Sequence, residues 1–286
     1  MREKRKTAGR KIKDYMKRDP VGFVSLILIL VFLILAVFAD VIAPYGLNET
    51  QYTASREAPS AEHLLGTDEL SRDIFSRILY ASRISLFIGL APTTVNLVVG
   101  TLLGMIAGMT SSKLLDNIIM RAADIVLSYP FMILAMAIVY NLGASTRNLF
   151  LALILVGWAS TARTVRSQTQ SLKNSTFIEA AYSMGVSKWK IMIKHILPNI
   201  RSTLLVLYTM SIPSAILSEA GLSFLGFGAQ PPQTSLGVMV SNGRKYLFDA
   251  PWISLAPAVY ILVLSMCLNF FGDSLRDMLD PKRTVK

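Results

Sequence analysis

Long stretches without a charged residue limit most strongly how this chain can fold. They cover residues 21–39, 84–112, 125–146, 148–162, 202–218, 220–243 and 250–272. A helix that crosses the hydrocarbon core of a membrane needs roughly 20 mostly apolar residues, and most of these runs reach or approach that length. The sequence therefore predicts an all-α integral membrane protein.

Six of these runs are predicted to be transmembrane helices, and residues 220–243 are not. This exception contains five Gly and the Pro231–Pro232 pair. Irregular backbone of this kind would leave its N–H and C=O groups without hydrogen bonds in lipid. We therefore expect residues 220–243 to form a loop or re-entrant turn packed on protein. The short run 148–162 is flanked by Arg147 and Arg163, whose side chains can extend to the two interfaces.

Composition argues against several other classes of protein. Only 16% of the residues are charged, which is well below the roughly 25% of a typical soluble domain. The single Cys267 and the distant His63 and His195 predict no metal site and no disulfide. The net charge of +11 does not indicate nucleic-acid binding, because the basic residues lie between apolar runs, as topology signals do.

The distribution of Lys and Arg predicts how the chain is threaded through the membrane. An even number of spans puts both termini on one side, together with residues 110–122 and 163–201. These segments and the two termini hold 22 of the 29 Lys and Arg residues. Because cytoplasmic segments are enriched in these residues, both termini are expected in the cytoplasm. No small-residue cleavage site follows the first apolar run, so we expect it to be a retained helix and not a signal peptide.

This threading divides the chain into successive segments on the two sides of the membrane. They are a basic cytoplasmic N-terminus (1–20), a first transmembrane helix (21–43), an extracytoplasmic loop (44–83), a five-helix core (84–273) that includes a cytoplasmic loop (166–200), and a cytoplasmic tail (274–286).

The predicted cytoplasmic loop contains the start and stop signals of two short helices. Thr176 and Glu179 fit a capping box, in which Thr176 is the N-cap of the first helix. Gly185 stands where a helix stop requires a residue with positive φ. Ser187 can begin a second helix through Trp189, and Pro198 is expected to end it before the next span. The loop is thus predicted to be a helix–glycine–helix elbow.

Two functions fit an elbow of this kind. Its apolar side chains could fill a cleft on another protein, as a helix does in a groove. They could equally lie among lipid headgroups as an interfacial amphipathic helix. The pattern alone leaves both alternatives open.

Several stretches resemble a known family of transporters. Glu179-Ala180-Ala181, followed by Tyr182, Gly185 and then Ile196-Leu197-Pro198, is similar to the EAA loop of ABC-importer permeases. Residues 63–77, 121–130, 219–228 and 272–281 resemble the dipeptide, oligopeptide and nickel importers, in particular their second permease subunit. The chain departs from the family pattern at His63-Leu64-Leu65-Gly66 and at Ser71.

The resemblance implies a fold, a mechanism and a set of partners. It implies the six-helix bundle of a type I ABC-importer permease in a bacterial or archaeal cytoplasmic membrane. The loop would be a coupling helix that docks on an ATPase subunit. The partners would be a second homologous permease, two ABC ATPases that hold ATP and Mg, an extracytoplasmic binding protein and the lipid bilayer. No cofactor is expected on this chain, whose coupling residues would be Glu179, Ala180, Ala181, Tyr182, Gly185, Trp189, Leu197 and Pro198.

Other residues are candidates for gating or packing. Gly100, Gly104 and Gly108 share one helix face, which suits either packing within the chain or a contact between permeases. Asp124 is expected near a helix N-terminus, where the helix dipole would stabilise it. Pro130 lies within a predicted span, where neighbouring helices can tolerate a kink. Glu219 is expected at the outer end of the fifth span, with a structural or a gating role.

Catalysis by this chain is not predicted. It has no G-x-x-x-x-G-K-[ST], H-E-x-x-H or G-x-S-x-G motif. The Asp68, Glu69, Arg72, Asp73, Arg77 cluster is better explained by ion pairing than by acid–base chemistry. The alternative function is an ion-driven secondary transporter, which would need paired ionisable residues near the middle of the membrane. Which solute is carried does not follow from the sequence.

Overall fold

A computed structural model describes residues 19–50 and 55–279, and this part of the chain is helical, with an isolated bridge between Thr67 and Asp73. The prediction of an all-α membrane protein is confirmed. The helices in chain order are α2 (Pro20–Val37), α3 (Ala39–Ile42), α4 (Ile74–Met109), α5 (Lys113–Ser128), α6 (Phe131–Leu142), α7 (Thr146–Lys173), α8 (Thr176–Ser183), α9 (Lys188–Ile191), a π-helical turn (Met192–Ile196), α10 (Leu197–Phe224), α11 (Leu236–Gly243), a 3-10 turn (Arg244–Tyr246) and α12 (Trp252–Leu279).

Five helices are long and apolar enough to cross a membrane within the described residues. They are α2, α4, α7, α12 and the continuous stretch Lys188–Phe224. The sixth span is a bent pair, because α5 and α6 meet at 94°. The kink expected at Pro130 within residues 125–146 is thus a break between two helices. Pro130 explains the break, since it lacks an N–H and forces Tyr129 into an extended conformation with φ −99° and ψ 145°.

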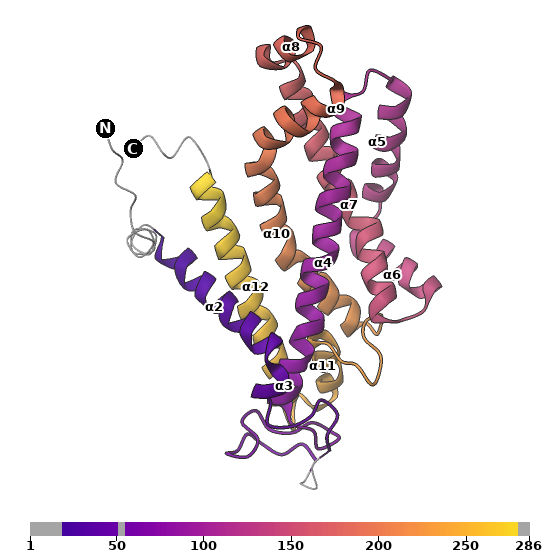
Figure 1. Ribbon diagram of the computed structural model, residues 1–286. Helices are drawn as coiled ribbons and strands as arrows, with labels where there is room; N and C mark the ends of the chain where they lie inside the picture. Colours follow the sequence, from indigo (N-terminus) through magenta and orange to yellow (C-terminus); the bar gives the residue numbers. More distant parts are fainter. Residues whose placement is uncertain (1–18, 51–54, 280–286) are drawn as a thin grey trace, which may run out of the picture.

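The glycine face of α4 packs against α7 in the same chain. A Cβ added to Gly100, Gly104 or Gly108 would lie 2.6 Å from Thr161, from the Ala162 carbonyl oxygen or from Thr169, respectively. Residues later in α4 contact residues later in α7, so the two helices run parallel and side by side (Figure 1). Of the two alternatives for these glycines, the structure shows packing within the chain.

The first span is attached to the core at both of its ends. At its start, Gly22 lies against Ser274 of α12. At its end, Arg83 of α4 donates hydrogen bonds to the carbonyl oxygens of Ala36 (2.6 Å) and Val37 (2.8 Å) and to Asp40 (2.8 Å). The Arg83 hydrogen bond also lowers the pKa of the Asp40 carboxyl. Arg83 thus satisfies carbonyls that the end of α2 would leave unpaired.

The end of the molecule that carries α3 and α11 contains more helix than expected (Figure 1). Helix α4 begins at Ile74, inside the range 44–83 that was predicted to be a loop. Residues 220–243 are also partly helical, because α10 continues to Phe224 and α11 begins at Leu236. The predicted packing on protein is found, since Gly237 of α11 fits closely against the backbone of Ala220.

Candidate functional site

The elbow at the opposite end of the molecule, where α8 and α9 lie, begins one residue earlier than predicted (Figure 1). Ser175 is the N-cap of α8, with φ −83° and ψ 147°, and Thr176 is already helical. The capping-box assignment of Thr176 is therefore wrong. Ser175 does not cap through its side chain either, because its hydroxyl donates to the Leu172 carbonyl oxygen (2.6 Å) at the end of α7. Ser175 thus begins α8 and bonds to a carbonyl in the last turn of α7.

The glycine turn of the elbow is confirmed. Gly185 has φ +75°, and its N–H donates to the Tyr182 carbonyl oxygen at 2.9 Å. The N–H of Val186 reaches back to the Ala181 carbonyl oxygen at 3.1 Å. These bonds close the end of α8 in the manner of a glycine-terminated helix. A Cβ at residue 185 would meet nothing within 4 Å, so the backbone conformation alone calls for glycine.

The second half of the elbow does not end at Pro198. Ser187 is the N-cap of α9, and the chain then stays helical through the π-helical turn into α10. Pro198 lies in the first turn of α10 and Leu197 begins that helix. A proline inside a helix lacks one N–H and crowds the carbonyl four residues earlier, here that of Lys194. The wider π turn at Met192–Ile196 accommodates this, which is why the predicted stop is not formed.

The elbow has one buried face and one exposed face. Ile178, Ala181, Ile191, Met192 and Ile196 pack with Met105 and Met109 of α4, Val165 of α7 and Ile200 of α10. The opposite face exposes Glu179 and Ala180 together with the larger apolar side chains Phe177, Met184, Trp189 and Ile193. The predicted coupling residues are thus divided, with Ala181 inside and Glu179, Ala180 and Trp189 outside.

Tyr182 and Lys188 tie the elbow to its surroundings, and Lys173, the last residue of α7, contacts the same turn as Lys188. Tyr182 is half-buried against the apolar cluster, and this burial raises the pKa of its hydroxyl. Lys188 Nζ donates to Ser111 Oγ at 3.2 Å, and Lys173 Nζ donates to the Thr110 carbonyl oxygen at 3.4 Å. The elbow is therefore in direct contact with the turn that joins α4 to α5.

A cavity of about 410 Å³ lies between α4, α5, α6, α7 and α10. Its wall is mostly apolar, and none of its described lining residues is Asp, Glu, Lys, Arg or His. Hydroxyl groups supply most of its polarity, from Thr93, Ser160, Ser211, Ser214 and Ser218. The cavity was not predicted. The spacing of the three α10 serines, which places them on one face of an apolar span, is the sequence signal that could have indicated it.

Asp124 lies beside this cavity in a setting different from the predicted one. It is in the last turns of α5, so the dipole at a helix N-terminus does not stabilise it. Its Oδ1 accepts a hydrogen bond from Arg163 of α7 at 2.5 Å, and Arg121 lies 4.0 Å from its Oδ2. Pro130 lies just after the end of α5 and is the N-cap of α6 at the bend between the two helices.

Glu219 is fully buried between α4 and α10. Ser85 Oγ of α4 donates to one carboxyl oxygen at 2.8 Å, and Ser223 Oγ donates to the other at 2.6 Å. Buried carboxyl groups require such partners, because an unpaired one would cost several kcal/mol. The residue therefore joins two spans next to the loop that leads to α11.

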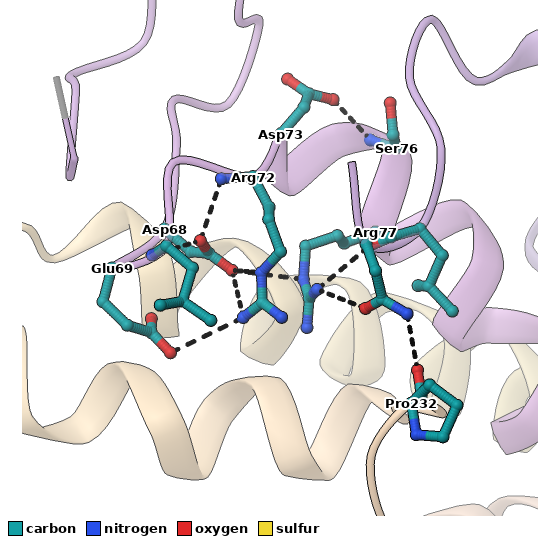
Figure 2. A network of polar contacts seen from close by, with 10 residues as sticks. Asp68, Glu69, Arg72, Asp73, Ser76, Arg77 and Pro232 are labelled. Atoms are coloured by element: carbon teal, nitrogen blue, oxygen red, sulfur yellow. Dashed lines mark hydrogen bonds and ion pairs between the residues drawn. The ribbon is translucent and has the colours of Figure 1, made fainter. Parts of the chain in front are cut away.

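The charged cluster predicted near residue 70 forms one connected network. Figure 2 shows Asp68 accepting from Arg72 Nε at 2.7 Å and lying 3.4 Å from Arg77 Nε. Arg77 donates to the Leu47 carbonyl oxygen at 3.0 Å, and Asn48 donates to the Pro232 carbonyl oxygen at 2.9 Å. The network thus joins three segments that are far apart in the sequence.

At the start of α4 in the same region, both carboxylate oxygens of Asp73 have partners. Asp73 is the N-cap of α4, where it accepts from the Ser76 N–H at 2.7 Å, and its other oxygen lies 3.0 Å from His63 Nδ1. Across the described residues, no group of three or more His, Cys, Asp and Glu side chains could hold a metal ion. Cys267 is buried in α12.

Comparisons with known proteins place these features in context. Residues 100–285 match the family described as binding-protein-dependent transport system inner membrane component, and residues 9–59 match the N-terminal transmembrane domain of oligopeptide transport permease C. A dipeptide transport permease of Alkalihalophilus pseudofirmus is 40% identical over 93% of this chain and 88% of the relative. A glutathione transport permease of Pectobacterium atrosepticum is 39% identical over 93% and 88%.

A solved structure supports the assignment of the fold. The inward-facing methionine ABC transporter MetNI contains a chain that matches with a TM-score of 0.58 and 18% identity, over 72% of this chain and 96% of that one. At this low identity the match concerns the fold alone, which is the type I ABC-importer permease fold that the sequence predicts.

Proposed function

The chain belongs to the family of binding-protein-dependent transport system inner membrane components, and from this membership we propose that it is a permease subunit of an ATP-driven importer of short peptides. It is a multi-pass protein of the cytoplasmic membrane. In the proposed complex it pairs with a second homologous permease, and two ABC ATPases bind ATP and Mg. An extracytoplasmic binding protein delivers the peptide.

The two-faced elbow carries this proposal. A helix that only lies among lipid headgroups needs no glycine turn and no buried inner face. Here the inner face is fixed to α4, α7 and α10, while Phe177, Met184 and Trp189 remain exposed. An exposed apolar face on a rigid support is suited to a groove in another protein. We infer that this face docks on the ATPase, with both chain termini in the same compartment.

The contacts behind the elbow supply a route for coupling. A shift of α8 and α9 would act on the α4–α5 turn through Lys188, whose Nζ donates to Ser111 Oγ. It would also act on α10, because α9 continues into that helix. These helices line the cavity, so closure of the ATPases would change its shape. The two states would be populated according to which partners are bound.

The cavity suits passage of a peptide better than its retention. Its hydroxyls can form hydrogen bonds with a peptide backbone of any sequence, and its described lining holds no charge that would trap an ionised solute. Selection among dipeptides, longer peptides, glutathione-like compounds or nickel complexes would then rest mainly with the binding protein. That protein would dock at the outer end, near the network of Figure 2.

Co-purification tests the proposed docking face. We expect the tagged chain, extracted gently from its native membrane, to bring down a second permease and a P-loop ATPase. Phe177→Asp should lose the ATPase and keep the second permease, because it places a charge on the exposed face of α8. Phe248→Asp is the matched control, since Phe248 is fully exposed at the other end of the molecule. We expect this control to keep both partners.

Two results would contradict the proposal. Equal loss of the ATPase in both variants would show that the face of α8 has no special part in docking. A chain that purifies alone and transports solute in liposomes on an ion gradient, without ATP, would identify a secondary transporter instead.

A further inference from the structure

One ion pair stands between the cavity and the elbow. On α5, Asp124 lies one turn before Leu127, which lines the cavity; on α7, Arg163 lies one turn after Ser160, which also lines it. Both displacements point toward the end of the molecule that carries the elbow. The side chains of Asp124 and Arg163 remain 46% and 55% exposed in the single chain.

The surroundings of the pair favour binding of an anion. Arg121 lies 4.0 Å from Asp124, so the site holds two guanidinium groups and one carboxylate. The described cavity lining holds no charged side chain. Along α5 and α7, Asp124 and Arg163 are therefore the ionised groups nearest to the cavity lining on the side of the elbow. A peptide arriving there presents a terminal carboxylate.

We propose that Arg163 is a transit site for the terminal carboxylate of a peptide, and that this carboxylate replaces Asp124 as the partner of Arg163 during passage. The inference rests on the proposed function and names the group of the substrate that this chain recognises. The planar guanidinium can bind a carboxylate through two parallel hydrogen bonds. Half-exposed ion pairs are weak enough to exchange partners. Arg121 stays close to Asp124 and neutralises it when Arg163 is released.

A second ion pair on the same two helices provides a matched control. Arg166 of α7 donates two hydrogen bonds to Asp116 of α5, both at 2.6 Å. Asp116 precedes Asp124 by eight residues, which is roughly 12 Å along the helix. Neither Asp116 nor Arg166 is adjacent to a residue that lines the cavity. This pair holds α5 against α7 and is less exposed, at 29% for Arg166 and 21% for Asp116.

The test uses the complete transporter in proteoliposomes and compares two dipeptides, one with a free carboxyl terminus and one with an amidated terminus. Arg163→Gln should lower ATP-driven uptake of the free acid relative to the amide by about tenfold or more, the scale of a lost charge-assisted hydrogen bond. Arg163→Lys, which keeps the charge but loses the planar fork, should change the ratio less. Arg166→Gln should leave the ratio unchanged, whatever it does to overall uptake.

The ratio separates the possible outcomes, because each variant serves as its own reference for folding and assembly. An unchanged ratio in Arg163→Gln, or an equal change in Arg166→Gln, would overturn the transit site and leave the importer function standing. A wild-type complex that carries neither dipeptide would overturn the proposed function, and this inference with it.

Discussion

At the scale of single residues, Gly185 is required for its backbone conformation and not for space around its Cα. Its φ of +75° is costly for residues with a Cβ, and most costly for β-branched ones, yet an added Cβ would meet no atom within 4 Å. A substitution there tests the angle of the elbow and nothing else nearby. This role could be predicted from the sequence, because a glycine between two capped helical segments commonly ends the first of them.

Gly185→Val should uncouple ATP hydrolysis from transport while the protein still inserts in the membrane. The strain of a β-branched residue at positive φ, about 1–3 kcal/mol, would reorient α8 relative to α9. We expect ATPase activity of the reconstituted complex to persist while peptide uptake falls severalfold. Gly185→Asn is the control, because asparagine tolerates this conformation. Normal coupling in Gly185→Val would show that the elbow does not transmit the motion.

For other residues, the sequence indicated a structural or functional role but not the interaction partner. Asp124 was expected to be stabilised by a helix N-terminus, yet its partner is Arg163, 39 positions away. Glu219 is held by Ser85, 134 positions away. A partner at such a distance depends on how the helices pack, and local pattern carries no information about that packing.

At the scale of helices, the parallel contact between α4 and α7 is the most extensive helix contact in the described part of the chain. The three glycines of α4 bring the backbones together, and the Ala162 carbonyl oxygen would lie 2.6 Å from a Cβ at residue 104. Backbone atoms cannot turn aside as a flexible side chain can, so even one methyl group must force the helices apart.

Gly104→Ala should therefore destabilise the protein although alanine is the better helix former. Overpacking of a tight contact costs about 1–3 kcal/mol, which outweighs the helix-propensity gain of roughly 1 kcal/mol over most of that range. Gly272→Ala in α12 is the matched control, because its new Cβ would come no closer than 3.5 Å to any neighbour. We expect a lower thermal midpoint for Gly104→Ala and an equal or higher one for Gly272→Ala. Equal midpoints would mean that the helices separate without cost.

The existence of the spans could be predicted from apolar length, but their ends and breaks could not. Pro130 was counted as a kink that neighbouring helices would tolerate, yet it divides the span into α5 and α6. Pro198 was expected to stop a helix, yet a π turn carries the helix past it. A proline in the sequence indicates only that one backbone hydrogen bond is missing. Whether the helix bends, breaks or widens at that point depends on how the surrounding helices pack.

At the scale of the whole molecule, the proposed function depends on two ends that are expected to face different compartments. The elbow lies at one end, and the charged network of Figure 2 lies with α11 at the other. The cavity between them combines side chains from five helices, and this is why no single stretch of sequence indicated it. Docking of an ATPase and of a binding protein both require that these ends lie on opposite sides of the membrane.

Labelling of single cysteines from each side of the membrane tests this arrangement. In a Cys267→Ala background, we expect Ser187→Cys, in the exposed elbow, to react with a membrane-impermeant maleimide only from the cytoplasmic side. Gln233→Cys, exposed in the loop before α11, should react only from outside. The physical reason is the charge distribution, since the segments that the sequence predicts to be cytoplasmic, the elbow among them, hold 22 of the 29 Lys and Arg residues. The reverse pattern would place the elbow where no ATPase can reach it, and the importer mechanism would have to be abandoned even though the helices pack as described.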